Sequence, residues 1–231
     1  MSGRSTVLAA DTMGVAEGAA GAFAVPLAPR PGERHWLVQD DGRCLPLPAR
    51  RWHGPAEPEL CQLARRCTGP TVDVGCGPGR LTVAVARRGV VALGIDTSPV
   101  AVRLTRNRGA DALLRDVFER LPDEGRWAHV LLVDGNVGIG GDPAALLRRC
   151  AELLRPGGSA LVELARPGTG LWRGQAYVAS GDRHGPRHRG PVFRWARLGI
   201  ELLDGYASGQ GLPVRAMYTT HGRWFAELVR R

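Results

Sequence analysis

The sequence contains no lysine: its 31 basic residues are all arginine and face 22 acidic residues, which gives this chain of 231 residues a formal net charge of +9. The absence of lysine excludes Schiff-base chemistry, attachment of pyridoxal phosphate and a Walker-type phosphate loop, because each needs that side chain. Arginine in place of lysine, with 32 glycines and 17 prolines, indicates a GC-rich genome. The net charge is therefore weak evidence for a nucleic-acid partner.

Paired cysteines and long apolar runs are also missing. The five cysteines include no C-x-x-C spacing, which argues against a structural zinc site or a disulfide framework and predicts free thiols in a reducing compartment. No stretch approaches the roughly 18 to 20 apolar residues of a transmembrane helix. The N-terminus is a poor signal peptide, because Asp11 cuts its apolar run short. We therefore expect a cytoplasmic protein with no metal site and no membrane partner.

The N-terminal quarter differs in character from the rest of the chain. Residues 1 to about 24 are rich in Ala and Gly and are predicted to be mobile. Residues 35–38 and 44–47 predict a hairpin, since the Asp-Gly between these apolar runs is a turn signal. The surrounding prolines favour edge strands.

From residue 58 onward, short apolar segments alternate with helical ones. The predicted strands are 71–74, 90–95, 112–114, 128–133 and 159–164, and the predicted helices are 58–66, 80–88, 99–107 and 143–154. Continuous apolar strands separated by helices indicate a parallel sheet that is covered on both faces. We predict a doubly wound α/β domain over residues 58–231, preceded by an N-terminal extension of residues 1–57.

The last third of the chain breaks this alternation. Residues 165–194 form a basic insert rich in Gly, Pro, Arg and His around a strand-like piece at 175–179. A helix is predicted from Trp195 to about Tyr206. Residues 214–220 and 224–229 then predict a C-terminal antiparallel hairpin with its turn at His221-Gly222.

The most informative stretch is DVGCGPG at residues 73–79. A strand ends there in glycines that let the backbone approach a ligand, and the next helix begins with free N–H groups. The spacing is G-x-G-x-G, whereas dinucleotide-binding folds show G-x-G-x-x-G. Asp73, two positions before the first glycine, suits a cationic amine. Asp96 ends the second strand, where a carboxylate can bridge both hydroxyls of a ribose.

Together these segments resemble the class I S-adenosylmethionine-dependent methyltransferases. The resemblance rests on VDVGCGPG at 72–79, GIDTSP at 94–99, RDV at 115–117, LLVD at 131–134 and LRPGG at 154–158. It implies a Rossmann-like, mostly parallel seven-stranded sheet with a reversed last strand, and S-adenosyl-L-methionine as the cofactor. It does not identify the methyl acceptor.

The resemblance further implies which residues of the glycine loop bind the cofactor. The backbone of Gly75, Cys76, Gly77 and Gly79 would pack against the methionine portion, with Asp73 near its amino group. Cys76 is read as a small apolar filler rather than a nucleophile.

The remaining cofactor contacts are implied at the ends of the next strands. Asp96 and Thr97 would hold the ribose, and Asp116 with Val117 would face the adenine. The passage towards the sulfonium would be lined by Asp134 and Gly135.

The loop after the fourth strand, DGNVGIGGD at 134–142, bears on the reaction subclass. It has neither the Asn/Asp-Pro-Pro-aromatic motif of enzymes that methylate exocyclic base amines nor the Pro-Cys of cytosine C5 enzymes. Asn136 is its only side chain able to orient a substrate heteroatom. A plain strand-to-helix loop capped by Asp142 is an equally good interpretation.

The sequence does not assign the catalytic residues. Methyl transfer depends mainly on holding the nucleophile close and collinear, and a general base is needed only for a protonated acceptor. Candidate bases are His184, His188, His221 and Glu163, although a loop histidine is more often a solvated surface residue. The catalytic candidates are therefore Asn136, His184 and His221.

Positive charge concentrates in one segment: residues 173–197 contain six arginines and one acid. We hypothesise a basic lid or hairpin that recognises an anionic acceptor, with Arg183, Arg187, Arg189 and Arg194 as candidates. A solvated, arginine-rich loop is equally favoured. The tryptophans that flank the core could wall a pocket for a ring system, but buried packing is their default.

These features predict a methyltransferase that acts at O or N of a small-molecule acceptor, as a monomer or homodimer. An anionic acceptor is the option that the basic insert supports. Two alternatives stay open: an RNA or nucleotide methyltransferase, and a non-catalytic S-adenosylmethionine-binding protein. A nicotinamide-dependent oxidoreductase is the remotest of the alternatives.

Overall fold

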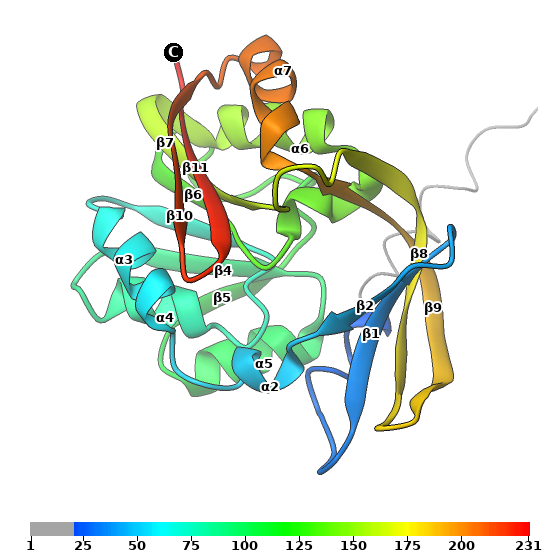
Figure 1. Ribbon diagram of the computed structural model, residues 1–231. Helices are drawn as coiled ribbons and strands as arrows, with labels where there is room; N and C mark the ends of the chain where they lie inside the picture. Colours follow the sequence, from blue (N-terminus) through cyan, green and yellow to red (C-terminus); the bar gives the residue numbers. More distant parts are fainter. Residues whose placement is uncertain (1–20) are drawn as a thin grey trace, which may run out of the picture.

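Two β-sheets dominate the computed structural model, which describes residues 21–231 (Figure 1). The larger sheet has seven strands in the order β10-β11-β7-β6-β3-β4-β5, and the smaller has four in the order β2-β1-β8-β9. The predicted mobility of residues 1–24 concerns mainly residues 1–20, which lie outside the described residues.

The seven-stranded sheet confirms the predicted α/β fold. Its strands are β3 (Thr71–Val74), β4 (Ala92–Asp96), β5 (Asp111–Leu114), β6 (Trp127–Leu132), β7 (Leu154–Leu164), β10 (Val214–Thr220) and β11 (Arg223–Val229). Neighbours from β7 to β5 pair in parallel, while β11 pairs antiparallel with both β7 and β10. The reversed strand is therefore β11, as the resemblance implied.

Helices cover both faces of this sheet. They are α3 (Pro58–Arg66), α4 (Arg80–Ala86), α5 (Pro99–Asn107), α6 (Pro143–Leu153) and α7 (Leu203–Ala207), and a short helix α2 (Ala49–Trp52) precedes α3 in the chain. The apolar side chains of α3 and α4 form one core cluster with the sheet, and those of α6 and α7 form another on the opposite face. Within residues 21–231, no helix is long and apolar enough to cross a bilayer.

The start of α6 shows how local sequence sets a helix boundary. The Asp142 carboxylate accepts hydrogen bonds from the backbone N–H groups of Ala144 and Ala145, at 3.1 and 3.3 Å, and Pro143 opens the first turn. The side chain caps N–H groups that would otherwise lack a partner. The predicted capping role of Asp142 is confirmed.

The four-stranded sheet joins the N-terminal segment to the insert. The predicted hairpin is confirmed as β1 (Arg34–Gln39) and β2 (Cys44–Leu47), and the insert forms a long hairpin of β8 (Leu171–Asp182) and β9 (Gly185–Leu198). β2 is an edge strand as expected, but β1 pairs with both β2 and β8. It can do so because β1 contains no proline, so its N–H groups remain available for pairing.

The helix predicted from Trp195 to about Tyr206 is wrong at its start. Residues 195–198 belong to β9, a short 3₁₀ turn follows at Ile200–Leu202, and the helix α7 spans only Leu203–Ala207. Phe193 and Trp195 are buried while Arg194 between them is exposed. This period of two is the pattern of a strand, and burial against the rest of the protein decides it.

The smaller sheet docks on the loop after β6, a 3₁₀ segment η1 (Asn136–Gly141). A Cβ at Gly138 would overlap the backbone oxygen of Ala196 in β9, and one at Gly141 would lie 3.0 Å from the Cβ of Arg194. Gly138 and Gly141 are thus required for the close approach of the two backbones.

The boundary predicted between residues 57 and 58 falls between α2 and α3. The strands on its N-terminal side pair with the insert on its C-terminal side. We keep the division into 1–57 and 58–231 as a prediction about folding units.

Candidate functional site

A cavity of about 460 Å³ lies where the carboxyl ends of β3, β4 and β6 face the smaller sheet. One half is lined by the glycine loop and by residues at strand ends. The other half is lined by apolar side chains of the N-terminal segment, α2, β1, β2 and β9. Of the cofactor-binding residues predicted from the sequence, those that line the cavity are Asp73, Gly75, Cys76, Gly77, Asp96, Thr97, Asp116, Val117 and Asp134.

Hydrogen bonds to the side chains of Asn136 and Asp96 fix the conformation of the glycine loop. The Asn136 side-chain amide donates to the backbone oxygens of Val74 and Gly75, at 2.8 and 2.9 Å. The backbone N–H of Gly77 donates to Asp96 at 2.9 Å. Gly75 and Gly77 both have positive φ, and a Cβ at Gly75 would lie 2.7 Å from the Asn136 amide nitrogen. The loop therefore has one conformation that glycine alone fits easily.

Two predicted residues support the loop without lining the cavity. Gly79 precedes α4 and packs against Thr105, whose hydroxyl donates to the backbone oxygen of Gly77 at 2.9 Å. Gly135 precedes η1 with a positive φ. Both act by shaping the turns on which the lining residues stand.

Asp73 is a buried carboxylate at the end of β3. Its one hydrogen bond from a side chain comes from the Thr82 hydroxyl at 2.7 Å, and among the described residues no arginine or histidine pairs with it. Desolvation, joined by the nearby charges of Asp134 and Asp96, raises the pKa of Asp73 to about 6, although the hydrogen bond from Thr82 lowers it in part. An unpaired buried carboxylate of this kind favours a cationic ligand.

Asp96 ends β4 on the same rim. Its carboxylate accepts from the backbone N–H groups of Gly77 and Ser98, at 2.9 and 2.8 Å. Burial raises the pKa of Asp96, while these N–H donors lower it in part. The carboxylate has lone pairs left for hydroxyl donors of a ligand.

The segment after β5 completes this half of the cavity. Asp116 accepts from the backbone N–H of Phe118 at 2.9 Å and has no ion-pair partner in the described part of the chain. Val117 is buried beside it, and Phe118 is partly exposed at the rim. An apolar side chain flanked by an acceptor suits a flat ring with an amino group.

Cys76 is packed as predicted for a small apolar side chain. It lies against Gly94 of the neighbouring strand, where a Cβ would be 2.8 Å from its sulfur. Burial raises the pKa of Cys76 well above its ordinary value, so the thiol stays protonated.

Asp134 differs from the other three aspartates because it is neutralised by arginine. Its carboxylate pairs with Arg80 at 2.5 Å and with Arg223 at 3.0 Å. Arg80 also pairs with Glu57, and Arg223 pairs with Glu163 at 2.6 Å. This chain of charges connects α3, α4, β7, β11 and the loop after β6, and Arg80 exposes only 4% of its side chain. Arg80 has no role in the sequence predictions, since nothing in its neighbours there marks it as buried.

The candidate catalytic residues do not lie together in the structure. Asn136 lines the cavity, with both amide hydrogens committed to backbone oxygens, so its carbonyl oxygen is the atom that could face an acceptor. His184 lies in the β8–β9 turn and His221 in the β10–β11 turn, and neither lines the cavity. Glu163 is bonded to Arg223 and to the backbone N–H of Asp134.

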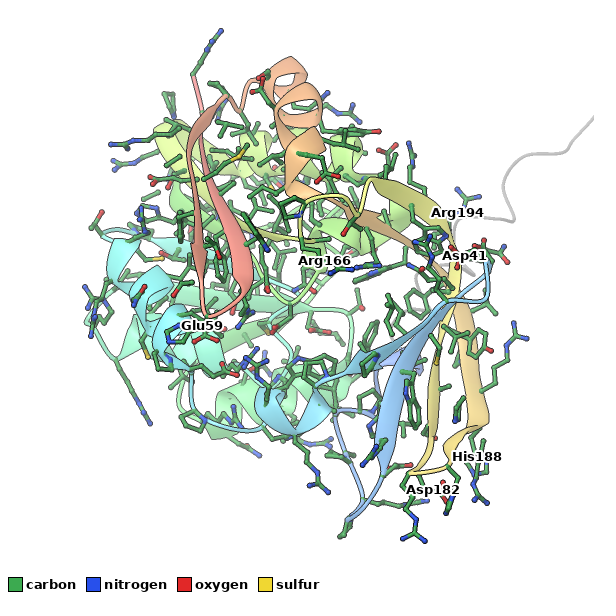
Figure 2. All side chains as sticks on the ribbon, in the orientation of Figure 1. Asp41, Glu59, Arg166, Asp182, His188 and Arg194 are labelled. Carbon is green, nitrogen blue, oxygen red and sulfur yellow. The ribbon has the colours of Figure 1, made fainter. Side chains whose placement is uncertain are left out.

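The insert contributes one of its four candidate arginines to the cavity, Arg194. Arg187 pairs with Asp182 at 2.8 Å, and the Arg189 guanidinium lies 4.2 Å from the centre of the Tyr177 ring. Figure 2 shows Asp182 and His188 at the far tip of the hairpin, away from Arg194. Three of the four candidate arginines therefore lie on the outer part of the hairpin, away from the cavity.

Comparison with known proteins agrees with this geometry. Residues 71–158 match the family described as "Methyltransferase domain". This stretch holds the glycine loop and all the strand ends that bear the aspartates, within a sheet of the class I strand order. Residues 71–158 form a class I methyltransferase domain.

The relatives of this methyltransferase domain include ubiquinone biosynthesis O-methyltransferases. The one from Xanthomonas campestris is 32% identical over 131 residues, covering 48% of this chain and 54% of that protein. The one from Xylella fastidiosa is 30% identical over 126 residues, covering 48% and 51%. The chain thus spans about half the length of the curated relatives it matches.

Solved structures share the fold over more of the chain. An S-adenosylmethionine-dependent methyltransferase from Bacteroides fragilis, in complex with S-adenosyl-L-homocysteine, matches with a TM-score of 0.71 and 21% identity over 94% of this chain and 97% of that one. An amino pentose methyltransferase from Micromonospora echinaspora gives a TM-score of 0.59 and 19% identity, covering 79% and 95%. At these identities the likeness concerns the fold of the methyltransferase domain.

Proposed function

We propose that this protein transfers a methyl group from S-adenosyl-L-methionine to an oxygen or nitrogen atom of a small-molecule acceptor. The observation that carries the proposal is the pair of carboxylates, the buried Asp73 and the partly buried Asp96, that flank the glycine loop without an arginine partner. A cofactor that brings an ammonium, a sulfonium and a ribose diol would satisfy both. Relatives named as O-methyltransferases support the same reaction class.

The residues present fit this cofactor one portion at a time. Asp73 would hold the ammonium, the backbone at Gly75 and Gly77 would face the methionine portion, and Asp96 would hold the ribose. Asp116 and Val117 would face the adenine. The cofactor supplies a methyl carbon activated by a positive sulfur, so the chain's task is to bind and orient the two reactants.

The chain offers no obvious general base for the acceptor. Among the described residues, no histidine lines the cavity, and Glu163 and Asp134 are held in ion pairs with arginine. The proposed source of rate acceleration is therefore the positioning of the two reactants by Asn136 and the strand ends. An acceptor that is already deprotonated, or that loses its proton to water, suits such a site.

We also make an inference about the location and the partners of the protein. We infer a cytoplasmic protein, and its five free cysteines are in keeping with a reducing compartment. A small-molecule acceptor in preference to a nucleic acid, no membrane partner, and a monomer or homodimer complete the inference.

Calorimetry with S-adenosyl-L-homocysteine tests the proposal directly. The wild-type protein should bind it, and Asp96→Ala should weaken binding by about ten- to one-hundredfold, since each hydrogen bond to a charged group is worth about 1.5–3 kcal/mol. Asp111→Ala, an exposed carboxylate in the adjacent strand β5, is the matched control and should leave affinity unchanged. Equal affinities for Asp96→Ala and wild type would contradict the ribose assignment, and no binding to wild type would contradict the proposed function.

A further inference from the structure

The apolar half of the cavity is formed mainly by parts of the chain outside the family match. Its lining residues from the N-terminal segment to α3 and from β9 are Phe23, Leu27, Leu37, Leu47, Trp52, Leu60, Phe193 and Trp195. Arg194 is the one charged side chain that β9 adds at this rim. This half therefore differs chemically from the half lined by aspartates.

Four of these side chains form a continuous aromatic wall, which we define as Phe23, Trp52, Phe193 and Trp195. Phe23 is at its centre, with ring centroids 6.4 Å from Trp52, 5.5 Å from Phe193 and 5.9 Å from Trp195. Phe193 and Trp195 meet edge to face at 5.7 Å. These separations are those at which aromatic rings attract one another, and an additional ring can join such a cluster favourably.

Ile139 of η1 lies at the junction of the two halves. It lines the cavity, packs against the core beneath the seven-stranded sheet, and also packs against the cluster that contains Phe193 and Trp195. A ligand seated on the aromatic wall would therefore border the rim that carries Asp134 and Asn136.

The aromatic wall is a poor surface for a polyhydroxylated acceptor. Hydroxyl groups of a sugar facing it would lose hydrogen bonds to water. The four wall side chains offer only the indole N–H groups of Trp52 and Trp195 as donors and no acceptor, so each hydroxyl left unpaired costs about 1–3 kcal/mol. A flat apolar ring loses few hydrogen bonds to water when it binds there, and it buries apolar surface against the wall. Shape and polarity thus favour an aromatic ring and disfavour a sugar.

We propose that the methyl acceptor of this protein is a flat, mainly apolar ring compound, such as a hydroxylated or nitrogen-containing aromatic, that binds against the aromatic wall. This inference rests on the proposed function for the chemistry, but the wall itself can be tested by binding alone. Phe23 is the specificity-determining residue that the structure assigns, because it touches the other three rings and is only partly buried.

The test uses the full chain and two probes of similar size, 2-naphthol and methyl α-D-glucopyranoside. Binding of each is measured by calorimetry in the presence and absence of saturating S-adenosyl-L-homocysteine. We expect 2-naphthol to bind at least about tenfold more tightly than the glucoside. Phe23→Ala should weaken 2-naphthol binding about three- to tenfold, and affinity for S-adenosyl-L-homocysteine should change less than twofold.

Two further variants make the result specific. Phe23→Leu keeps an apolar side chain without a ring and should show a smaller loss in the same direction. Trp36→Ala is the matched control, because Trp36 lies on β1 beside the cavity-lining Leu37 and its side chain points to the opposite face of the sheet. It should alter neither affinity.

The outcomes separate this inference from the proposed function. Binding of S-adenosyl-L-homocysteine with equal affinities for naphthol and glucoside, or naphthol binding that Phe23→Ala leaves intact, would overturn the aromatic acceptor and leave the methyltransferase proposal standing. Naphthol binding that depends on Phe23 in a protein that fails to bind S-adenosyl-L-homocysteine would overturn the proposed function and uphold the ring site.

Discussion

At the scale of single residues, the cavity separates paired from unpaired carboxylates. Asp134 is neutralised by Arg80 and Arg223, whereas Asp73, Asp96 and Asp116 have no cationic partner among residues 21–231. Burying an unpaired charge is costly, and the raised pKa of Asp73 records that cost. The free protein is in this sense prepared for a cationic ligand.

The raised pKa of Asp73 predicts how cofactor affinity varies with pH. A ligand ammonium binds the ionised carboxylate, so below a pKa of about 6 a proton must leave before binding, and the affinity should fall about tenfold for each pH unit well below it. Calorimetry with S-adenosyl-L-homocysteine between pH 8 and pH 4.5 measures this. Asp73→Asn should bind weakly with little dependence on pH across this range. A wild-type affinity that does not change from pH 8 to pH 4.5 would refute the role of Asp73.

Arg194 predicts a modest preference for acceptors with an anionic substituent. Because this arginine is exposed, an ion pair with a ligand carboxylate is worth about 0.2–1 kcal/mol, or roughly 1.4- to fivefold in affinity. We expect 2-naphthoate to gain that factor relative to 2-naphthol, and Arg194→Ala to abolish the gain. Arg187→Ala, whose partner is Asp182 on the hairpin itself, should keep it. If both variants behaved alike, a general effect of the positive insert would explain the preference better.

At the scale of elements, the docking of β9 on η1 depends on the small size of Gly138. A methyl group there would overlap the Ala196 backbone oxygen and approach the Trp195 indole nitrogen to 2.9 Å. Gly138→Ala should therefore destabilise the protein by about 1–3 kcal/mol or more, since β9 must move away. Urea unfolding monitored by circular dichroism measures the change.

A second glycine variant provides the control for this prediction. Gly205 lies in α7 with open space around its Cα, so Gly205→Ala should be neutral or stabilise by up to about 1 kcal/mol. Equal effects of Gly138→Ala and Gly205→Ala would mean that η1 and β9 are not in tight contact.

The elements of the methyltransferase domain were predictable because each has a local cause. Pro99 with the Ser98 cap starts α5, and the β-branched Thr71, Val72 and Val74 favour a strand just before the glycine loop. The strand β9 was missed because residues 195–206 carry no local preference strong enough to oppose a helix, and pairing with β8 decides the outcome.

The part of the site that lies in sequence motifs was predictable. Aspartates at strand ends are set by sequence position, so Asp73 and Asp96 could be placed from the chain alone. The aromatic wall could not, because Phe23 and Phe193 are 170 residues apart in sequence and meet only where the N-terminal segment packs against the four-stranded sheet. The tryptophans were noted, but nothing local distinguishes a pocket wall from ordinary core packing.

At the scale of the whole molecule, a network of charges joins segments that the sheet hydrogen bonds leave separate. Arg80 pairs with Glu57 just before α3 and with Asp134 after β6, and Arg223 of β11 reaches Glu59 and Glu163. Figure 2 shows Glu59 beside the turn of the β10–β11 hairpin. Removing one member leaves partly buried partners without their counter-charge, so stability should depend on the network as a unit.

Replacing Arg80 with Met tests this dependence, because Met occupies a similar volume without charge. Arg80→Met should lower the free energy of unfolding at pH 7 by about 3–5 kcal/mol. Arg87→Met, an exposed arginine just after the same helix α4, is the control and should stay within about 0.5 kcal/mol of wild type. Comparable losses in the two variants would show that the buried pairs contribute nothing beyond general charge.

The pH dependence of the Arg80→Met effect identifies its source. Burial raises the pKa of Glu57, but hydrogen bonds from Arg51 and Arg80 lower it, and the net pKa is below its ordinary 4.5. A carboxylate whose folded pKa is depressed contributes stability above pH 4.5 and loses it as the pH falls through the folded value. The difference between wild type and Arg80→Met, measured by urea unfolding from pH 7 downward, should therefore stay constant to about pH 4.5 and shrink below it. A difference that persisted unchanged at lower pH would mean that Arg80 stabilises the fold by packing its side chain and not by pairing with Glu57.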